Sequence, residues 1–113
     1  MCLFSRLADR NKGAEFLIDT SGENSLTDGM GHGTHVAGTI GSATWGVAKK
    51  THLFAVKVLD SNGDGTNAGV IAGIQYIVND AGRRREQCPK GIVSNMSLGG
   101  IKNAAVNSAV SPH

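Results

Sequence analysis

The sequence lacks the features that would assign it to several common functional classes. Its net charge is only +2 over 113 residues, so its charge does not indicate a nucleic acid or an anionic membrane as a partner. Its first residues, MCLFSRLADRNKG, contain no apolar run long enough for a signal peptide or a membrane span. Aromatic residues make up only 4%, but hydrophobic residues make up 40%, which is enough for the core of one small domain. We therefore expect no nucleic-acid or membrane partner. We also expect a monomer.

Cysteine is also scarce. Cys2 and Cys88 are the only cysteines, and neither belongs to a CxxC pair. Two thiols cannot form a zinc site without help from histidine, and the sequence leaves open whether these two pair with each other. The only basic run, Arg83–Arg85, is followed by Glu86, which is typical of a solvated loop at 82–91 rather than of a binding patch.

Glycine, in contrast, is abundant. The 16 glycines gather mainly at 29–46, 63–73 and 91–100, between apolar runs, where they favour tight turns and close backbone approach. The apolar runs predict strands at 14–19, 52–59 and 92–98, and helices at 33–40, 68–78 and 103–110. This alternation predicts an α/β fold with a parallel sheet covered by helices on both faces. Ligands of such sheets bind beyond the carboxyl ends of the strands, where the glycine clusters fall.

Two histidines stand in the glycine-rich stretch DGMGHGTHVAGT. A metal site at His32 and His35 would need further ligands, and the spacing differs from the HExxH of a zinc helix, so we predict no metal here. We expect His35 to be a packed structural side chain. His32 lies between glycines at the start of a predicted helix, so its ring stays approachable and suits general-base catalysis near neutral pH.

The segment DSNGDG at 60–65 matches the first half of a calcium-binding EF-hand loop. The glutamate that closes such a loop would fall at position 71, which is Ile71, and a predicted strand rather than a helix precedes the segment. We therefore predict a glycine-rich turn.

Four segments in succession resemble one family. GHGTHVAGT resembles the histidine signature of the subtilisin-like serine peptidases, the subtilases, and the segments 46–65, 71–78 and 88–100 resemble the proteinase K branch in order and spacing. The resemblance runs over 28–108, which makes residues 1–113 a partial catalytic domain. It implies a subtilisin-like α/β fold truncated at both ends and a serine endopeptidase activity that proceeds through an acyl-enzyme. It also implies a peptide or protein substrate, an extracellular location, and no cofactor in this segment, because the family's calcium sites lie outside it.

The resemblance implies a role for individual residues. His32 resembles the catalytic base, His35 resembles a structural histidine, and Asp28 stands beside them as a further structural residue. Ser97, Leu98 and Gly99 resemble the strand that lines the S1 pocket. Gly63, Asp64 and Gly65 resemble the facing edge, so that an extended substrate would lie between the two edges as an added strand.

Parts of the family pattern are missing. The sequence contains no Gly-Thr-Ser-Met-Ala-x-Pro-His motif, which carries the nucleophile, and it lacks the segment of the oxyanion asparagine. Asp19 stands only 13 residues before His32, much closer than the family places its triad aspartate, and we expect it to be structural. The family implies that Cys88 pairs with a cysteine that Cys2 does not align with. We expect the chain alone to be inactive. The alternatives are a truncated, non-catalytic relic that binds peptides weakly, and a small metal-binding module.

Overall fold

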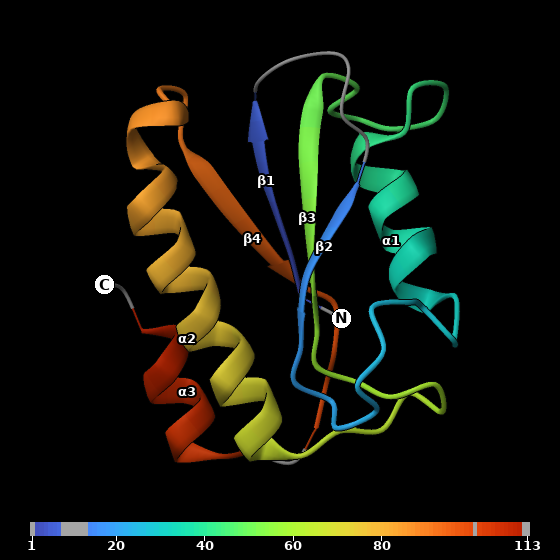
Figure 1. The fold of residues 1–113 in the computed structure, drawn as a ribbon, viewed down its shortest axis with the longest axis vertical. Helices are drawn as coiled ribbons and strands as arrows, with labels where there is room; N and C mark the ends of the chain where they lie inside the picture. The colour runs from blue at the N-terminus through green and yellow to red at the C-terminus, as the bar shows by residue number, and fades with distance from the viewer. Residues whose placement is uncertain (1, 8–13, 101, 112–113) are drawn as a thin grey trace.

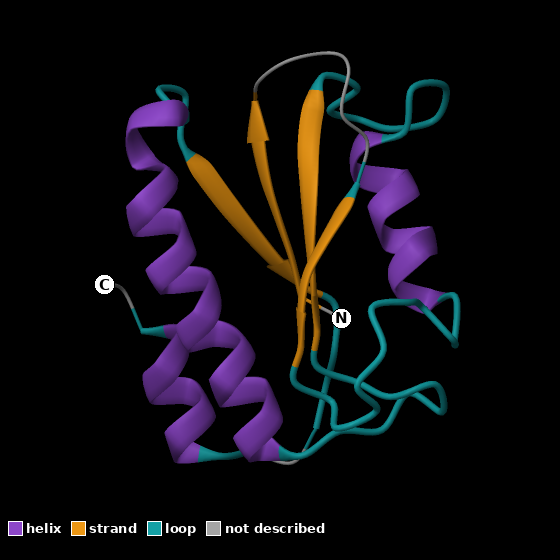
Figure 2. Ribbon diagram, in the orientation of Figure 1, coloured by secondary structure: helices purple, strands orange, loops and turns teal. Residues whose placement is uncertain are grey.

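A computed structural model describes residues 2–7, 14–100 and 102–111, with side chains described from residue 14 onward. A four-stranded sheet has helices on both of its faces (Figures 1 and 2). The elements in chain order are β1 (Cys2–Leu7), β2 (Glu15–Asp19), α1 (His32–Gly41), β3 (Thr51–Lys57), α2 (Asn67–Arg84), the 3₁₀ turn η1 (Arg85–Gln87), β4 (Ile92–Met96) and α3 (Ala104–Val110). Helix α1 covers one face of the sheet, whereas α2 and α3 lie together on the other face (Figure 1). The predicted α/β fold is confirmed.

The strand order in the sheet is β2-β3-β1-β4. Strand β2 pairs with β3 in parallel, and β1 pairs with both β3 and β4 antiparallel. The three predicted strands therefore run in one direction, as expected, and β1 is the one reversed strand. Strand β1 has no clear local sequence signal, because Ser5 and Arg6 interrupt its apolar residues. Backbone hydrogen bonds to a neighbour on each side form the strand instead.

Strand β3 lies at the centre of the core. Every residue from His52 to Val58 is buried, which explains why five of these seven residues are apolar. Side chains alternate between the two faces of a strand. Phe54, Val56 and Val58 therefore pack against α2, whereas Leu53 and Ala55 pack with Ala37 of α1. Strand β3 therefore packs against helices on both of its faces, and it ends shortly before the glycine-rich turn at 60–65.

Helix α2 is longer than predicted. It runs to Arg84, and η1 follows it directly, so the predicted loop at 82–91 shrinks to residues 88–91. Within the helix, Arg84 Nε donates to the buried Asp80 carboxylate at 2.5 Å. The Arg84 guanidinium also lies 4.5 Å from the centre of the Phe54 ring in β3, a tertiary contact that the local sequence does not indicate. In the described part of the chain, neither this helix nor any other is long and apolar enough to cross a membrane.

Candidate active site

A cavity of about 700 Å³ opens at the carboxyl ends of β3 and β4, beside the first turn of α1. Its lining includes His32, Gly63–Gly65, Leu98 and Gly99. Six of the seven residues predicted for catalysis or substrate binding therefore lie on one cavity. The exception is Ser97, which does not line it and whose Oγ instead accepts a hydrogen bond from Asn95 Nδ2 at 2.9 Å.

Most of the remaining lining residues were not predicted from the sequence. They include apolar side chains, and polar side chains from α3 and the residues just before it. The residues concerned are Met30, Leu59, Val70, Met96 and Val106, together with Lys102, Asn103 and Asn107. They come from five separate stretches of the chain, and no local pattern relates them. The fold brings these stretches together, with α2 and α3 side by side on one face of the sheet (Figure 1).

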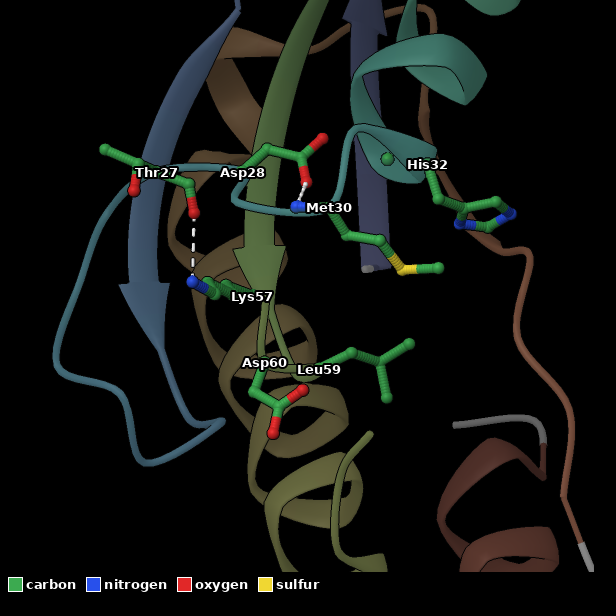
Figure 3. A pocket seen from close by; sticks show the side chains of 8 residues that line it. Thr27, Asp28, Met30, His32, Lys57, Leu59 and Asp60 are labelled. Carbon is green, nitrogen blue, oxygen red and sulfur yellow. Dashed lines mark hydrogen bonds between the residues drawn. The ribbon is translucent and has the colours of Figure 1, made fainter. Parts of the chain in front are cut away.

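His32 is the first residue of α1, and its side chain is exposed. Gly31 caps the helix with φ at +90°, a conformation that glycine adopts without the steric cost of a Cβ. No residue within 14–100 or 102–111 forms a hydrogen bond with the His32 ring. Figure 3 shows the ring beside Met30, pointing away from Asp28 and Lys57. Both ring nitrogens are therefore available to a second group in the cavity.

Asp28 holds the first turn of α1. Its Oδ1 accepts from Gly31 N at 2.9 Å and from Met30 N at 3.2 Å, and its Oδ2 accepts from Thr34 N at 2.7 Å and from Thr34 Oγ1 at 2.6 Å. Partial burial raises the pKa of Asp28, but these hydrogen bonds outweigh it and lower the pKa to about 2. The carboxylate is thus ionised and fully engaged with the backbone that carries His32, which supports the structural role expected for Asp28.

Asp19 also has a structural arrangement. Its carboxylate accepts from Ser21 N and Ser21 Oγ at 2.7 and 2.6 Å and from Ser25 N at 2.8 Å. Burial raises the pKa of Asp19, and these hydrogen bonds lower it below the ordinary value. The carboxylate therefore shapes the turn after β2 and forms no bond with His32, as expected.

His35 differs from the prediction. We expected a packed side chain, but His35 is exposed, so this prediction is wrong for the chain as described. The reason is that His35 does not lie on the face of α1 that packs against the sheet. Gly33 and Ala37 are buried on the face that α1 turns toward the sheet, and His35 lies on another face.

Residues 60–65 form the predicted turn. Asp60 N donates to Asp64 O at 2.7 Å, Gly63 N donates to Asp60 O at 3.0 Å, and Asp60 Oδ1 accepts from Asn62 N and Asp64 N. Gly63 has φ at +84°, and a Cβ at this position would meet Met30 Sδ at 2.6 Å. The described residues contain no group of three or more histidine, cysteine, aspartate or glutamate side chains that could hold a metal ion.

The register of β1 also bears on the two cysteines. Cys88 is buried and free. Cys2 pairs with Met96, the last residue of β4, whereas Cys88 precedes the first residue of that strand. The backbone thus places the two cysteines toward opposite ends of β4.

The sequence of the chain resembles those of known proteins. Residues 8–112 match the sequence model of the Subtilase family. The chain belongs to the subtilase family. It is 55% identical over 107 residues to proteinase T of Parengyodontium album, and 57% identical over 93 residues to the subtilisin-like serine protease AsES of Sarocladium strictum. These matches cover 95% and 82% of this chain, respectively. The resemblance to subtilisin-like serine peptidases is confirmed.

A solved structure agrees with the sequence matches. A cold-adapted subtilisin-like serine proteinase superposes with a TM-score of 0.63 at 30% identity, over 90% of this chain and 44% of that protein. The subtilisin-like fold is therefore confirmed. The chain spans only 36% of the length of proteinase T and 23% of that of AsES, so it represents part of a subtilase catalytic domain.

Proposed function

We propose that this chain carries the histidine and both substrate-binding edges of a serine endopeptidase of the subtilisin and proteinase K type. In this role His32 takes the proton from a serine hydroxyl and returns it to the leaving amine. One observation carries the proposal: His32, the edge 63–65 and the edge formed by Leu98 and Gly99 line the same cavity. The exposed, unpartnered His32 ring has the access that a general base needs.

The substrate in this proposal is an extended peptide that lies between the two edges. Both edges contain glycine, which lets a peptide backbone approach closely, and main-chain hydrogen bonds then supply much of the affinity. The apolar lining residues Val70, Met96 and Val106 favour an apolar side chain of the peptide over a charged one, because burial of a charge without a partner is costly.

The hydrolytic step needs groups that the 113 residues do not contain. The sequence has no Gly-Thr-Ser motif, and the two aspartates nearest to His32 in sequence, Asp19 and Asp28, are hydrogen-bonded to the backbone and to serine or threonine side chains. We therefore propose that the chain alone binds peptides and does not cleave them. We also propose an extracellular location and action on protein substrates, which the family relationship supports. The alternative of a truncated, non-catalytic relic also predicts weak peptide binding. It differs in that the chain then belongs to no active peptidase.

The purified 113-residue chain tests the proposal by NMR. We expect titration with the capped peptide Ac-Ala-Ala-Leu-Ala-Ala-NH₂ to shift the amide signals of His32, Gly63, Gly65 and Gly99, with a smaller effect on the exposed loop residue Val47 as an internal control. We expect a fluorophosphonate probe, which reacts with activated serine, to leave the chain unlabelled. The absence of peptide-induced shifts at the cavity would refute the binding site, and stoichiometric labelling would refute the proposed inactivity.

A further inference from the structure

Lys57 is a buried cation at the last position of β3. Its side chain is only 4% exposed, and a buried charge is costly unless it is paired and hydrogen-bonded. The Nζ atom donates to Glu23 Oε2 at 2.5 Å and to the backbone oxygen of Thr27 at 3.0 Å. Both partners come from the loop between β2 and α1, which is more than 25 residues away in sequence. The local sequence gives one sign of this arrangement, a lysine at the end of a buried and mainly apolar strand, and does not indicate its partners.

The hydrogen bond from Lys57 to Thr27 connects the buried lysine with the segment that carries His32. Thr27 directly precedes Asp28, whose carboxylate holds the backbone of Gly31 and Thr34 at the start of α1, and His32 is the first residue of that helix. Figure 3 shows Lys57 and Thr27 joined on one side of Asp28 and His32 on the other. The position of the His32 backbone is therefore tied to the Lys57 ammonium through a short run of chain.

The hydrogen bond from Lys57 to Glu23 connects the buried lysine with the turn that forms the 63–65 edge. Glu23 Oε1 accepts from Ser61 N at 2.9 Å, and Glu23 Oε2 accepts from Ser61 Oγ at 3.0 Å. Ser61 stands two residues before Gly63, the first residue of the 63–65 edge. Pairing with Lys57, together with the hydrogen bonds from Ser61, lowers the pKa of Glu23, so the carboxylate is ionised at neutral pH. One carboxylate thus joins the buried cation to the turn that forms one wall of the cavity.

The geometry points to Glu23 as a positioning residue of the candidate site. We infer that Glu23 and Lys57 together set the separation between the His32 turn and the 63–65 edge, and hence the width of the peptide cleft. The inference rests on the proposed function and adds a residue to it. The packing agrees, because Met30 Sδ lies against Gly63 where the two segments meet, so a change in their separation would open this contact.

Two variants of the 113-residue chain separate positioning from stability. Glu23→Gln keeps the shape of the side chain and removes the charge that pairs with Lys57. The double variant Glu23→Leu with Lys57→Met removes both charges, and such a replacement of an ion pair by apolar groups is often neutral or stabilising. Glu86→Gln is the control, because Glu86 is exposed in η1, on the far end of α2 from the cavity.

Two readouts are measured for each variant. The first needs no ligand: the nuclear Overhauser contacts between the Met30 methyl group and Gly63, and the exchange protection of the Ser61 amide. The second is the dissociation constant of Ac-Ala-Ala-Leu-Ala-Ala-NH₂. For both variants we expect loss of the Met30–Gly63 contacts, a fall in Ser61 protection of about tenfold, and a rise in the dissociation constant of about tenfold. Glu86→Gln should leave all three values unchanged.

The double variant decides between the two roles. If it keeps the wild-type melting temperature and still loses the contacts and the affinity, Glu23 positions the cleft. Wild-type contacts and affinity in the double variant would overturn the inference, whatever Glu23→Gln does to stability. If the wild-type chain does not bind the peptide, the proposed function fails, and the Met30–Gly63 contacts and the Ser61 protection alone then support or overturn the positioning role.

Discussion

The capping of α1 by Asp28 yields a quantitative prediction, because a single carboxylate holds the turn that carries His32. Asp28→Asn removes the negative charge and replaces one carboxylate oxygen, an acceptor, with an NH₂ group, which is a donor. The hydrogen bond from either Gly31 N or Thr34 N is therefore lost. Loss of a capping side chain costs about 0.5–2 kcal/mol of stability. We therefore expect the free energy of unfolding at pH 6 to fall by about 1–2 kcal/mol.

The pKa of Asp28 gives a second estimate of the same quantity. The pKa falls from the ordinary 3.8 to about 2 in the folded chain, and a shift of this size corresponds to about 2.4 kcal/mol at 1.36 kcal/mol per unit. Because the carboxylate is partly exposed to solvent, which screens the interaction, the contribution reduces to about 1–2 kcal/mol. Since the folded pKa is the lower one, this stability is present in full above pH 3.8 and is lost as the pH falls toward 2.

Urea unfolding followed by far-ultraviolet circular dichroism, at several pH values from 2 to 6, measures the effect. The difference in unfolding free energy between the wild-type chain and Asp28→Asn removes the contribution of the other carboxylates. We expect this difference to be about 1–2 kcal/mol at pH 6 and to shrink steadily below pH 4. A difference that stays constant from pH 6 to pH 2, or that never reaches 0.5 kcal/mol, would show that the Asp28 hydrogen bonds do not stabilise the turn as described.

Two further predictions concern the turn and the core. Gly63→Ala should destabilise the chain by about 1–2 kcal/mol, because φ is +84° and the new Cβ would meet Met30 Sδ; Gly82→Ala, at a helical position with open space, should instead raise the melting temperature. Val56→Ala should cost about 2–3 kcal/mol in urea unfolding, since Val56 is fully buried, whereas Val93→Ala at a 70% exposed position should stay within about 0.5 kcal/mol. Equal effects within either pair would contradict the assigned burial and backbone geometry.

The sequence predicted those features that depend on local pattern. The run 52–59 predicted a buried strand because both faces of β3 are covered, and the glycines around His32 predicted an exposed histidine at a helix start. The turn at 60–65 was also predictable, since Asp60 can bond the backbone two and four residues later. Each of these patterns involves residues close together in the sequence, so it can be recognised without knowledge of the fold.

Features that depend on distant contacts were not predictable. Near the end of α2, Arg84 contacts the Phe54 ring of β3, and the exposure of His35 depends on which face of α1 meets the sheet. The link from Glu23 through Lys57 to Ser61 joins three segments, and its only local sign is a charged residue in a buried strand. Pairing of β1 on both sides likewise depends on backbone groups of β3 and β4 and not on its own sequence.

The proton-transfer role of His32 is the central claim, and a chimera tests it most directly. Residues 28–108 of this chain replace the matching segment of proteinase T, to which the chain is 55% identical, so that the host supplies the groups absent here. Hydrolysis of a chromogenic peptide is then compared for His32→Ala and for the matched control His35→Ala, three residues further along the same helix. We predict an active chimera that loses more than about 10⁴-fold in kcat with His32→Ala and less than about tenfold with His35→Ala. An active chimera in which His32→Ala retains the rate would contradict the account.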